Sequence, residues 1–382
     1  MIFVPFALPG ERVSARIVTA HQRWARALLV EVVEPCAERI PPRCRHFTHC
    51  GGCHYQHMSY EGQLQAKAGI VAEQLRRIGG FESAPIQAAV ASPTPWNYRN
   101  HVQFSLTVEG KLGFVAASGE GVFAIEECHL LEQPLVDLWP RLNVTAVPGL
   151  ERVALRAGVE EDLLVVLHGE GDPEVEVQLY LPASVVWLGP GGAAVLAGDG
   201  HLVIEVLGRP YRVSAGSFFQ VNSSLVAELV SLTMEALEVS AGEVVFDLYA
   251  GVGLFSAALA ERGARLVAVE GSRWACDDFR VNLDEFEDVA LYQAPVLQAL
   301  PAIGEKPDAV LVDPPRAGLG RDVLDLLLEA GPQRLVYVSC DPATLARDGK
   351  GLAQAGYSLE RVTPLDMFPQ TFHIESVSLW RR

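Results

Sequence analysis

Residues 243–253 read Glu-Val-Val-Phe-Asp-Leu-Tyr-Ala-Gly-Val-Gly, an apolar run that ends at Asp247 and passes into a turn with two glycines. β-Branched and aromatic residues bounded by such a turn predict a buried strand. Further apolar runs alternate with helical patterns from residue 211 to about residue 360. This alternation predicts a parallel, doubly wound α/β sheet, in which ligands bind where the strands end.

Two more of these strand ends carry acidic or reactive side chains. Residues 309–312 are apolar and lead into Asp313, and residues 335–338 are apolar and lead into Ser339 and Cys340. A lone cysteine is usually a small buried hydrophobic residue. At the end of a parallel strand, however, Cys340 would share one crevice with Asp313, and we therefore interpret it as a candidate nucleophile.

The glycine turn also indicates which cofactor the crevice holds. Gly251 and Gly253 let the backbone approach a ligand closely, but Ser256 stands where the dinucleotide fingerprint G-x-G-x-x-G requires glycine. A second strand ends at Glu270, 23 residues after Asp247, where an acid can accept both hydroxyls of a ribose. A glycine loop without a complete phosphate site, followed by a ribose acid, favours S-adenosylmethionine over a dinucleotide.

Three of the seven cysteines are clustered in the sequence. Cys44, Cys50 and Cys53 lie within ten residues, and two glycines precede the third thiol and permit a tight turn. Cys128 is the natural fourth thiol. Four thiolates can hold either zinc or an iron–sulfur cluster. Three close cysteines with one remote cysteine are more typical of the cluster, whereas zinc sites usually combine two close pairs.

The chain divides into three parts by pattern. Residues 1–40 contain short strand-like runs with Pro-Gly punctuation, and we expect part of a small β-barrel there. Residues 41–210 contain the cysteine loop, a helix predicted at 58–79 that could pack on the catalytic domain, and a mostly antiparallel, β-rich sheet. Residues 211–382 form the predicted Rossmann-like α/β catalytic domain.

Composition limits the choice of partners. The chain has 382 residues, of which 49% are hydrophobic and 20% charged, and it lacks an apolar run of the roughly 18–20 residues that span a bilayer. The N-terminal residues make a poor signal peptide, so we expect a cytoplasmic protein without a membrane partner. The net charge of −17 argues against a polyanionic partner, but residues 1–101 carry 11 Lys or Arg against 7 Asp or Glu. A basic N-terminal part on an acidic body remains compatible with binding a nucleic acid.

The motifs of residues 35–382, in their order along the chain, resemble the RNA uracil-5-methyltransferases, which make 5-methyluridine in ribosomal and transfer RNA. The segments that carry this resemblance are Cys-x5-Cys-Gly-Gly-Cys from Cys44, Ala-Gly-Ser-Phe-Phe-Gln-Val-Asn at 215–222, the glycine turn at 247–253, Asp-Pro-Pro-Arg-Ala-Gly at 313–318, Ser-Cys-Asp-Pro at 339–342 and His-Ile-Glu-Ser at 373–376. The resemblance implies a class I methyltransferase domain preceded by a β-rich, RNA-binding domain and an N-terminal TRAM barrel.

The resemblance also implies a role for individual residues. It implies that Cys340 is the nucleophile and Glu375 the general base. The residues that it implies for S-adenosylmethionine are Gln220, Tyr249, Glu270 and Asp313, beside the turn residue Gly251. The family's [4Fe-4S] cluster would be held by Cys44, Cys50, Cys53 and Cys128. Two departures stand out: Leu254 replaces the asparagine of many members, and residues 1–40 hold at most part of the TRAM barrel, unless the chain begins further upstream.

The chemistry explains why these groups are needed together. C5 of uracil becomes nucleophilic only after a thiolate adds to C6, and a base must afterwards remove the C5 proton so that the thiol can leave. We expect Arg316 or Arg347 to favour the thiolate of Cys340. Phe218 and Phe219 are candidates to stack on the flipped base, although core packing is as good an interpretation for one of them.

The sequence leaves more than one substrate and more than one class of protein to compare. Members that act on transfer RNA often lack the cluster cysteines, so the intact set favours a 23S rRNA (uracil-5-)-methyltransferase, with transfer RNA as the alternative. An iron–sulfur redox or sensor protein would have no need for Cys340 and Glu375. A DNA cytosine-5 methyltransferase would use a Pro-Cys nucleophile, where this chain has Ser-Cys-Asp-Pro. We expect a monomer whose macromolecular partner is RNA.

Overall fold

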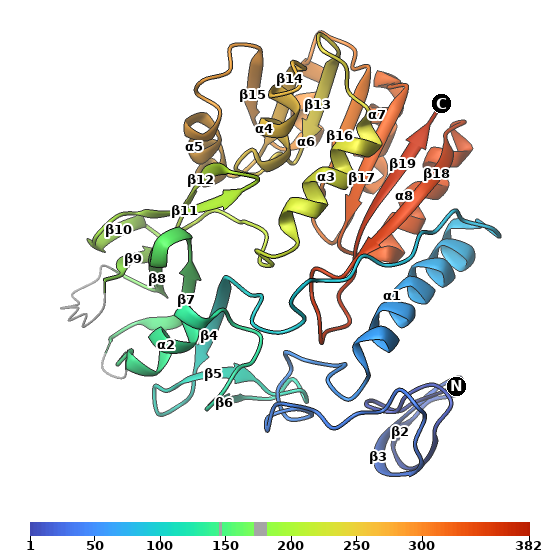
Figure 1. The fold of residues 1–382 in the computed structure, drawn as a ribbon, viewed down its shortest axis with the longest axis vertical. Coiled ribbons are helices and arrows are strands. Elements are labelled where there is room, and N and C mark those ends of the chain that lie inside the picture. The colour runs from blue at the N-terminus through green and yellow to red at the C-terminus, as the bar shows by residue number, and fades with distance from the viewer. Residues whose placement is uncertain (145–146, 172–181) are drawn as a thin grey trace.

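The computed structural model describes residues 1–144, 147–171 and 182–382 (Figure 1). Within these ranges the strands form four sheets: a three-stranded N-terminal sheet, a seven-stranded central sheet, a two-stranded hairpin and a seven-stranded C-terminal sheet. No helix in the described ranges is both long and apolar enough to cross a membrane.

The C-terminal sheet has the strand order β15-β14-β13-β16-β17-β19-β18. Its strands are β13 (Val244–Leu248), β14 (Arg265–Glu270), β15 (Val289–Gln293), β16 (Ala309–Val312), β17 (Arg334–Ser339), β18 (Ser358–Leu365) and β19 (Glu375–Arg381). The first five strands along the chain run parallel, and β19 lies antiparallel between β17 and β18. The predicted parallel, Rossmann-like sheet is confirmed, with an antiparallel pair added at one edge.

Both faces of this sheet are buried under helices. Val245 and Leu311 belong to one apolar core with α3, α4 and α5, whereas Phe246 and Val310 belong to a second core with α6, α7 and α8. The helices are α3 (Val226–Leu237), α4 (Leu254–Ala260), α5 (Arg273–Asn282), α6 (Val296–Ala299), α7 (Gly320–Ala330) and α8 (Pro342–Gln354), with a 3₁₀ turn at Leu300–Ala302. Because successive side chains point to opposite covered faces, the central strands β13, β16 and β17 are apolar along most of their length.

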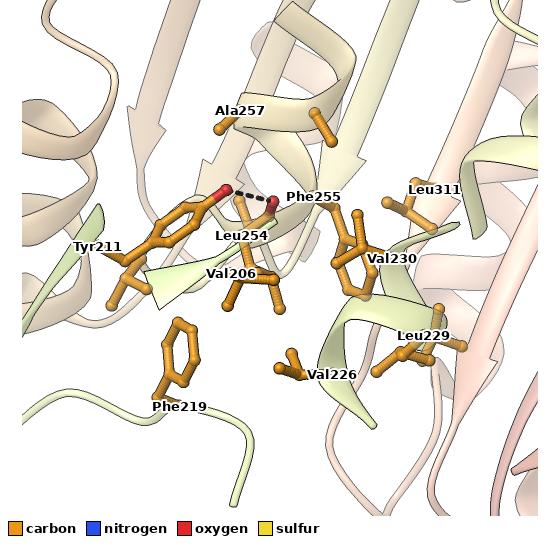
Figure 2. Packing of buried hydrophobic residues seen from close by; sticks show 14 of the residues in the cluster. Val206, Tyr211, Phe219, Val226, Leu229, Val230, Leu254, Phe255, Ala257 and Leu311 are labelled. Atoms are coloured by element: carbon orange, nitrogen blue, oxygen red, sulfur yellow. Dashed lines mark hydrogen bonds between the residues drawn. The ribbon is translucent and has the colours of Figure 1, made fainter. Parts of the chain in front are cut away.

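The hairpin of β11 (His201–Val206) and β12 (Arg209–Ser214) extends the first of these cores. Figure 2 shows Tyr211 and Phe219 beside Leu254, and the Tyr211 hydroxyl donates a hydrogen bond to the Leu254 carbonyl oxygen at 3.3 Å. The predicted domain boundary after residue 210 therefore falls inside β12, a strand whose buried side chains pack in the catalytic core.

The central sheet has the order β10-β9-β8-β7-β4-β5-β6. Its strands are β4 (His101–Leu106), β5 (Leu112–Val115), β6 (Val122–Ala124), β7 (Leu150–Ala157), β8 (Leu163–Gly169), β9 (Ser184–Gly189) and β10 (Gly192–Ala197), and α2 (Gln133–Leu138) packs beside β7, with short 3₁₀ turns at Trp139–Arg141 and Val159–Glu161. The described pairs are antiparallel except β8 with β9, which is parallel. This agrees with the expected mostly antiparallel sheet.

The N-terminal part consists of a small sheet and one long helix. The sheet contains β1 (Ile2–Phe3), β2 (Arg12–Ala20) and β3 (Ala25–Glu34), in the segment predicted to form part of a barrel. Helix α1 (Tyr60–Gln74) is capped by the Ser59 hydroxyl and continues as a π-helical turn over Leu75–Gly79, close to the predicted bounds. In Figure 1, α1 lies beside α8 and β18, and Val71 of α1 packs with Ala346 of α8.

Candidate active site

The antiparallel pair β17–β19 brings Cys340 and Glu375 together. Ser339, the last residue of β17, is paired with Ser376 of β19. Cys340 follows Ser339 and Glu375 precedes Ser376, so both lie at the same end of the sheet. Asp313 follows the neighbouring strand β16, whose Val312 is paired with a residue of β17. A thiol and two carboxyl groups that are far apart in the sequence therefore meet at the carboxyl ends of β16 and β17.

Burial raises the pKa of each carboxyl group in this crevice. Glu375 is only 3% exposed, and its pKa lies well above the ordinary value because of burial and the nearby charge of Asp313, partly offset by Arg316. Burial, with the charge of Asp247, raises the pKa of Asp313 to about 7. Asp247 is fully buried, and burial raises its pKa to about 7 although the Ser256 hydroxyl donates to it at 2.5 Å. Such a row of carboxyl groups favours a bound cation.

The thiol of Cys340 is harder to ionise than we expected. Burial, followed by the negative charges of Glu375 and Asp313, raises its pKa to about 11, and the positive charge of Arg316 acts in the opposite direction. Of the two arginines considered, Arg316 therefore acts on the thiol, whereas the guanidinium of Arg347 forms an ion pair with Asp348 at 2.8 Å and donates to the Ala317 carbonyl oxygen. A thiolate with so high a pKa is scarce but strongly nucleophilic once it forms.

The glycine turn is held against the end of β14. The backbone N–H of Gly251 donates to Glu270 Oε2 at 2.9 Å, and the N–H of Ser272 donates to Glu270 Oε1 at 2.6 Å. Tyr249 adopts a left-handed conformation with φ of 67°, which is rare for a residue with a side chain and typical of functional turns. Glycine is required at Gly253, because a Cβ there would lie 2.3 Å from a side-chain carbon of Leu283. Each oxygen of Glu270 keeps a lone pair for a ligand hydroxyl.

The loop that carries Gln220 is anchored on both sides. Asn100, beside β4, donates from its side-chain nitrogen to the Gln220 carbonyl oxygen at 3.0 Å. The buried carboxylate of Asp278 on α5 accepts hydrogen bonds from Ser214 and Ser217, so the loop is fixed to the catalytic domain as well. Contacts from both the central sheet and the catalytic domain thus position Gln220, which is 7% exposed.

The structure separates Phe218, which is exposed, from Phe219 and Leu254, which are buried. Phe219 is 8% exposed and belongs to the core, so core packing is the correct interpretation for this residue. Phe218 is 68% exposed and stays a candidate to contact the base. Leu254, which replaces the asparagine of many family members, is buried in the same core as Phe219.

The sequence did not indicate the contacts that hold the segment before Glu375. Lys67 of α1 forms a buried ion pair with Asp366, with 2.5 Å between Nζ and Oδ1. Gln63 of α1 and Gln370 bond reciprocally: the Gln63 amide nitrogen donates to Gln370 Oε1 at 3.0 Å, and the Gln370 backbone N–H donates to Gln63 Oε1 at 2.9 Å. These residues have no motif or periodicity that could have revealed them, since each pairing spans about 300 residues of sequence.

The four predicted metal ligands line one cavity. Cys44, Cys50, Cys53 and Cys128 lie along a space of about 1090 Å³ between the cysteine loop, the central sheet and β3. All four are free thiols, and burial raises the pKa of Cys53 to about 12 and that of Cys128 to about 11. Among the described residues, no group of three or more Cys, His, Asp or Glu side chains is close enough to hold a metal ion. Four thiols are nevertheless the kind and number of donors that a four-thiolate group requires.

The fold and the glycine turn define the protein as a class I S-adenosylmethionine-dependent methyltransferase. A family model described as tRNA (uracil-5-)-methyltransferase matches residues 200–291 and 305–382. The chain is 34% identical over 400 residues to the 23S rRNA (uracil(1939)-C(5))-methyltransferase RlmD of Pseudomonas entomophila, covering 99% of this chain and 88% of the relative. It is 33% identical over 396 residues to an uncharacterized RNA methyltransferase of Aquifex aeolicus, covering 99% and 92%.

A solved structure agrees with these relatives. The Pyrococcus abyssi tRNA (uracil-54, C5)-methyltransferase, determined in complex with S-adenosyl-L-homocysteine, superposes with a TM-score of 0.78 at 25% identity, covering 99% of this chain and 95% of that one. The chain belongs to the RNA uracil-5-methyltransferase family, which confirms the resemblance seen in the sequence.

The raised pKa of Cys340 can be tested by alkylation. We expect the rate of iodoacetamide modification of Cys340, followed by mass spectrometry of its peptide, to keep rising with pH towards about 11. Asp313→Asn should move this profile to lower pH because it removes a negative charge beside the thiol, and Arg316→Ala should move it to higher pH. A midpoint at or below the ordinary thiol pKa of about 8.5 would contradict this account.

Proposed function

We propose that this protein methylates C5 of a specific uridine in 23S ribosomal RNA, with S-adenosylmethionine as methyl donor and a covalent bond between Cys340 and C6 as the intermediate. The observation that carries the proposal is the meeting of Cys340 and Glu375 at one end of the β17–β19 pair. The match to RlmD along nearly the whole chain supports the ribosomal substrate. We further propose that the enzyme works as a cytoplasmic monomer.

The reaction assigns one task to each of these two residues. The thiolate of Cys340 bonds to C6, which makes C5 an enolate carbon. C5 then takes the methyl group of S-adenosylmethionine, and S-adenosylhomocysteine is the leaving group. Glu375 then takes the C5 proton, the C5–C6 double bond re-forms, and the bond from C6 to sulfur breaks to release the thiolate. The high pKa of Glu375 suits this last step, because a carboxylate with a raised pKa is a stronger base.

The positive charge of the cofactor complements the acidic crevice. When bound, S-adenosylmethionine supplies the methyl group and a sulfonium cation. Glu270 would accept the ribose hydroxyls, and Tyr249, Gly251, Gln220 and Asp313 would complete the site. A cation near Asp313 favours its ionised form and offsets the repulsion that raises the pKa of Cys340.

Transfer RNA is the second candidate substrate. The superposition with the tRNA (uracil-54, C5)-methyltransferase, at a TM-score of 0.78, favours it, as does the description of the family model. Against it, the four cysteines around one cavity support a [4Fe-4S] cluster on Cys44, Cys50, Cys53 and Cys128, a set that tRNA-specific members often lack.

The substrate assay decides between the two RNAs. Labelled methyl groups should pass from S-adenosylmethionine to unmodified 23S ribosomal RNA with a kcat/KM about tenfold or more above that for unmodified transfer RNA, the ratio that about 1.4 kcal/mol of differential transition-state binding gives. Nuclease digestion should yield 5-methyluridine. The reverse preference would assign the enzyme to transfer RNA, and transfer to neither RNA would overturn the proposed function.

The covalent mechanism predicts different defects for its two residues. Cys340→Ala should abolish methylation because no enolate can form at C5. Glu375→Gln should still add and methylate but fail to eliminate, and it should leave a protein–RNA conjugate that carries labelled methyl and survives denaturing electrophoresis. The double variant should form no conjugate. Normal turnover by Glu375→Gln would show that another group is the base.

The proposed cluster predicts iron rather than zinc. Protein prepared without oxygen should be brown and contain about four iron atoms per chain. Cys53→Ser should lose this iron, whereas Cys36→Ser, which changes a thiol outside the proposed set, should retain it. One zinc per chain and no visible absorbance would instead support the zinc alternative.

A further inference from the structure

An exposed ring stands beside the candidate active site, on a segment that is otherwise largely buried. Phe372 is 49% exposed, although Gln370 and Thr371 before it are each 2% exposed and Ile374 after it is also 2% exposed. The apolar face of this phenylalanine is therefore presented to solvent three residues before Glu375, where β19 begins.

The rings around Phe372 form a small platform. The His54 and Phe372 ring centroids are 4.4 Å apart in an edge arrangement, and those of Phe372 and His373 are also 4.4 Å apart. Arg316 Nη2 lies 3.3 Å from both ring nitrogens of His373. We call these four side chains, His54, Arg316, Phe372 and His373, the aromatic platform.

The backbone beneath the platform is fixed by several hydrogen bonds. The N–H groups of His54 and Tyr55 both donate to the Gln370 carbonyl oxygen, at 2.8 and 3.0 Å. The hydroxyl of Tyr98 donates to the Pro369 carbonyl oxygen at 3.1 Å. The exposure of Phe372 thus belongs to an ordered segment, and a ring that is already in place loses little conformational freedom on binding.

The platform also adjoins the reacting groups. Arg316 lies three residues after Asp313, in the turn that follows β16, and its charge acts on both Cys340 and Glu375. A uracil in contact with Cys340 would have to leave its stack, which leaves the neighbouring bases of the same strand without a stacking partner near the site. Unpaired bases stack on aromatic side chains, and guanidinium groups bind their phosphates.

We propose that the aromatic platform binds the nucleotide next to the target uridine, with its base stacked on Phe372 and its phosphate near Arg316. This inference rests on the proposed function and adds a specificity site to it. The electrostatic environment agrees: the positive charges of Arg316 and Arg99 act on His373, on a chain with a net charge of −17. A single strand of RNA is the polyanion that this arrangement complements.

The test uses methyl-transfer kinetics on the RNA that the wild-type enzyme methylates. Phe372→Ala should raise KM for RNA by about 5-fold to about 100-fold, the range for loss of one base–aromatic stack, while kcat changes by less. Phe372→Trp should restore KM. Val281→Ala is the matched control, because Val281 is similarly exposed, at 47%, but lies on α5, which packs at the β14–β15 end of the sheet.

An abasic nucleotide tests the same contact from the RNA side. RNA in which the base on either side of the target uridine is removed, one at a time, should bind wild-type protein more weakly at one of the two positions. The Phe372→Ala variant should not distinguish that RNA from the intact one. Equal KM values for wild type and Phe372→Ala, or equal losses on abasic RNA in both proteins, would overturn the platform. If the proposed function itself were wrong, the wild-type enzyme would methylate no RNA, so that failure can be told apart from failure of the platform.

Discussion

The buried ion pair between Lys67 and Asp366 is the constraint on which the catalytic arrangement depends. Both side chains are almost fully buried, at 1% and 0% exposure, and burial lowers the pKa of Lys67 and raises that of Asp366 despite their mutual attraction. Loss of either partner would leave an uncompensated charge in the interior, which costs about 3–5 kcal/mol. Lys67 also donates to the Phe368 carbonyl oxygen, so one ammonium group fixes both ends of the turn that starts the segment leading to Glu375.

This constraint joins parts of the chain that serve different tasks. Helix α1 contributes Lys67 and Gln63, and the cysteine loop contributes the backbone N–H groups of His54 and Tyr55, all to the segment 366–374. The position of the proposed base therefore depends on how the N-terminal part is folded, including the loop that contains Cys44, Cys50 and Cys53. A cluster there needs no electron transfer to influence the reaction, because ordering of the cysteine loop orders the backbone that precedes Glu375.

Local pattern predicted the catalytic sheet and the residues at its strand ends, whereas long-range contacts lay beyond it. Asp313 and Cys340 follow apolar runs that are buried on both faces, and such runs are visible in a sequence. Glu375 was assigned more from the family resemblance than from the pattern, since nothing in the pattern says that β19 inserts beside β17. The Lys67–Asp366 pair joins residues 299 positions apart. The sequence also left open which of Arg316 and Arg347 acts on the thiol, and Arg316 does so, whereas Arg347 pairs with Asp348. The sequence also left open which of Phe218 and Phe219 is buried, a matter that tertiary packing decides.

The distribution of charge explains how an acidic protein can act on RNA. The inner part of the site contains Asp247, Asp313 and Glu375. Burial and a neighbouring negative charge raise the pKa of each of them, an environment that favours a cationic sulfonium and disfavours phosphate. The outer part of the site carries Arg316, and the charge of Arg99 also acts there on His373. The two ligands of the proposed reaction have opposite charges, and each would meet a region of complementary sign. The uracil that passes between these regions is itself uncharged, so it can enter the acidic crevice while the phosphates of its strand stay at the basic mouth.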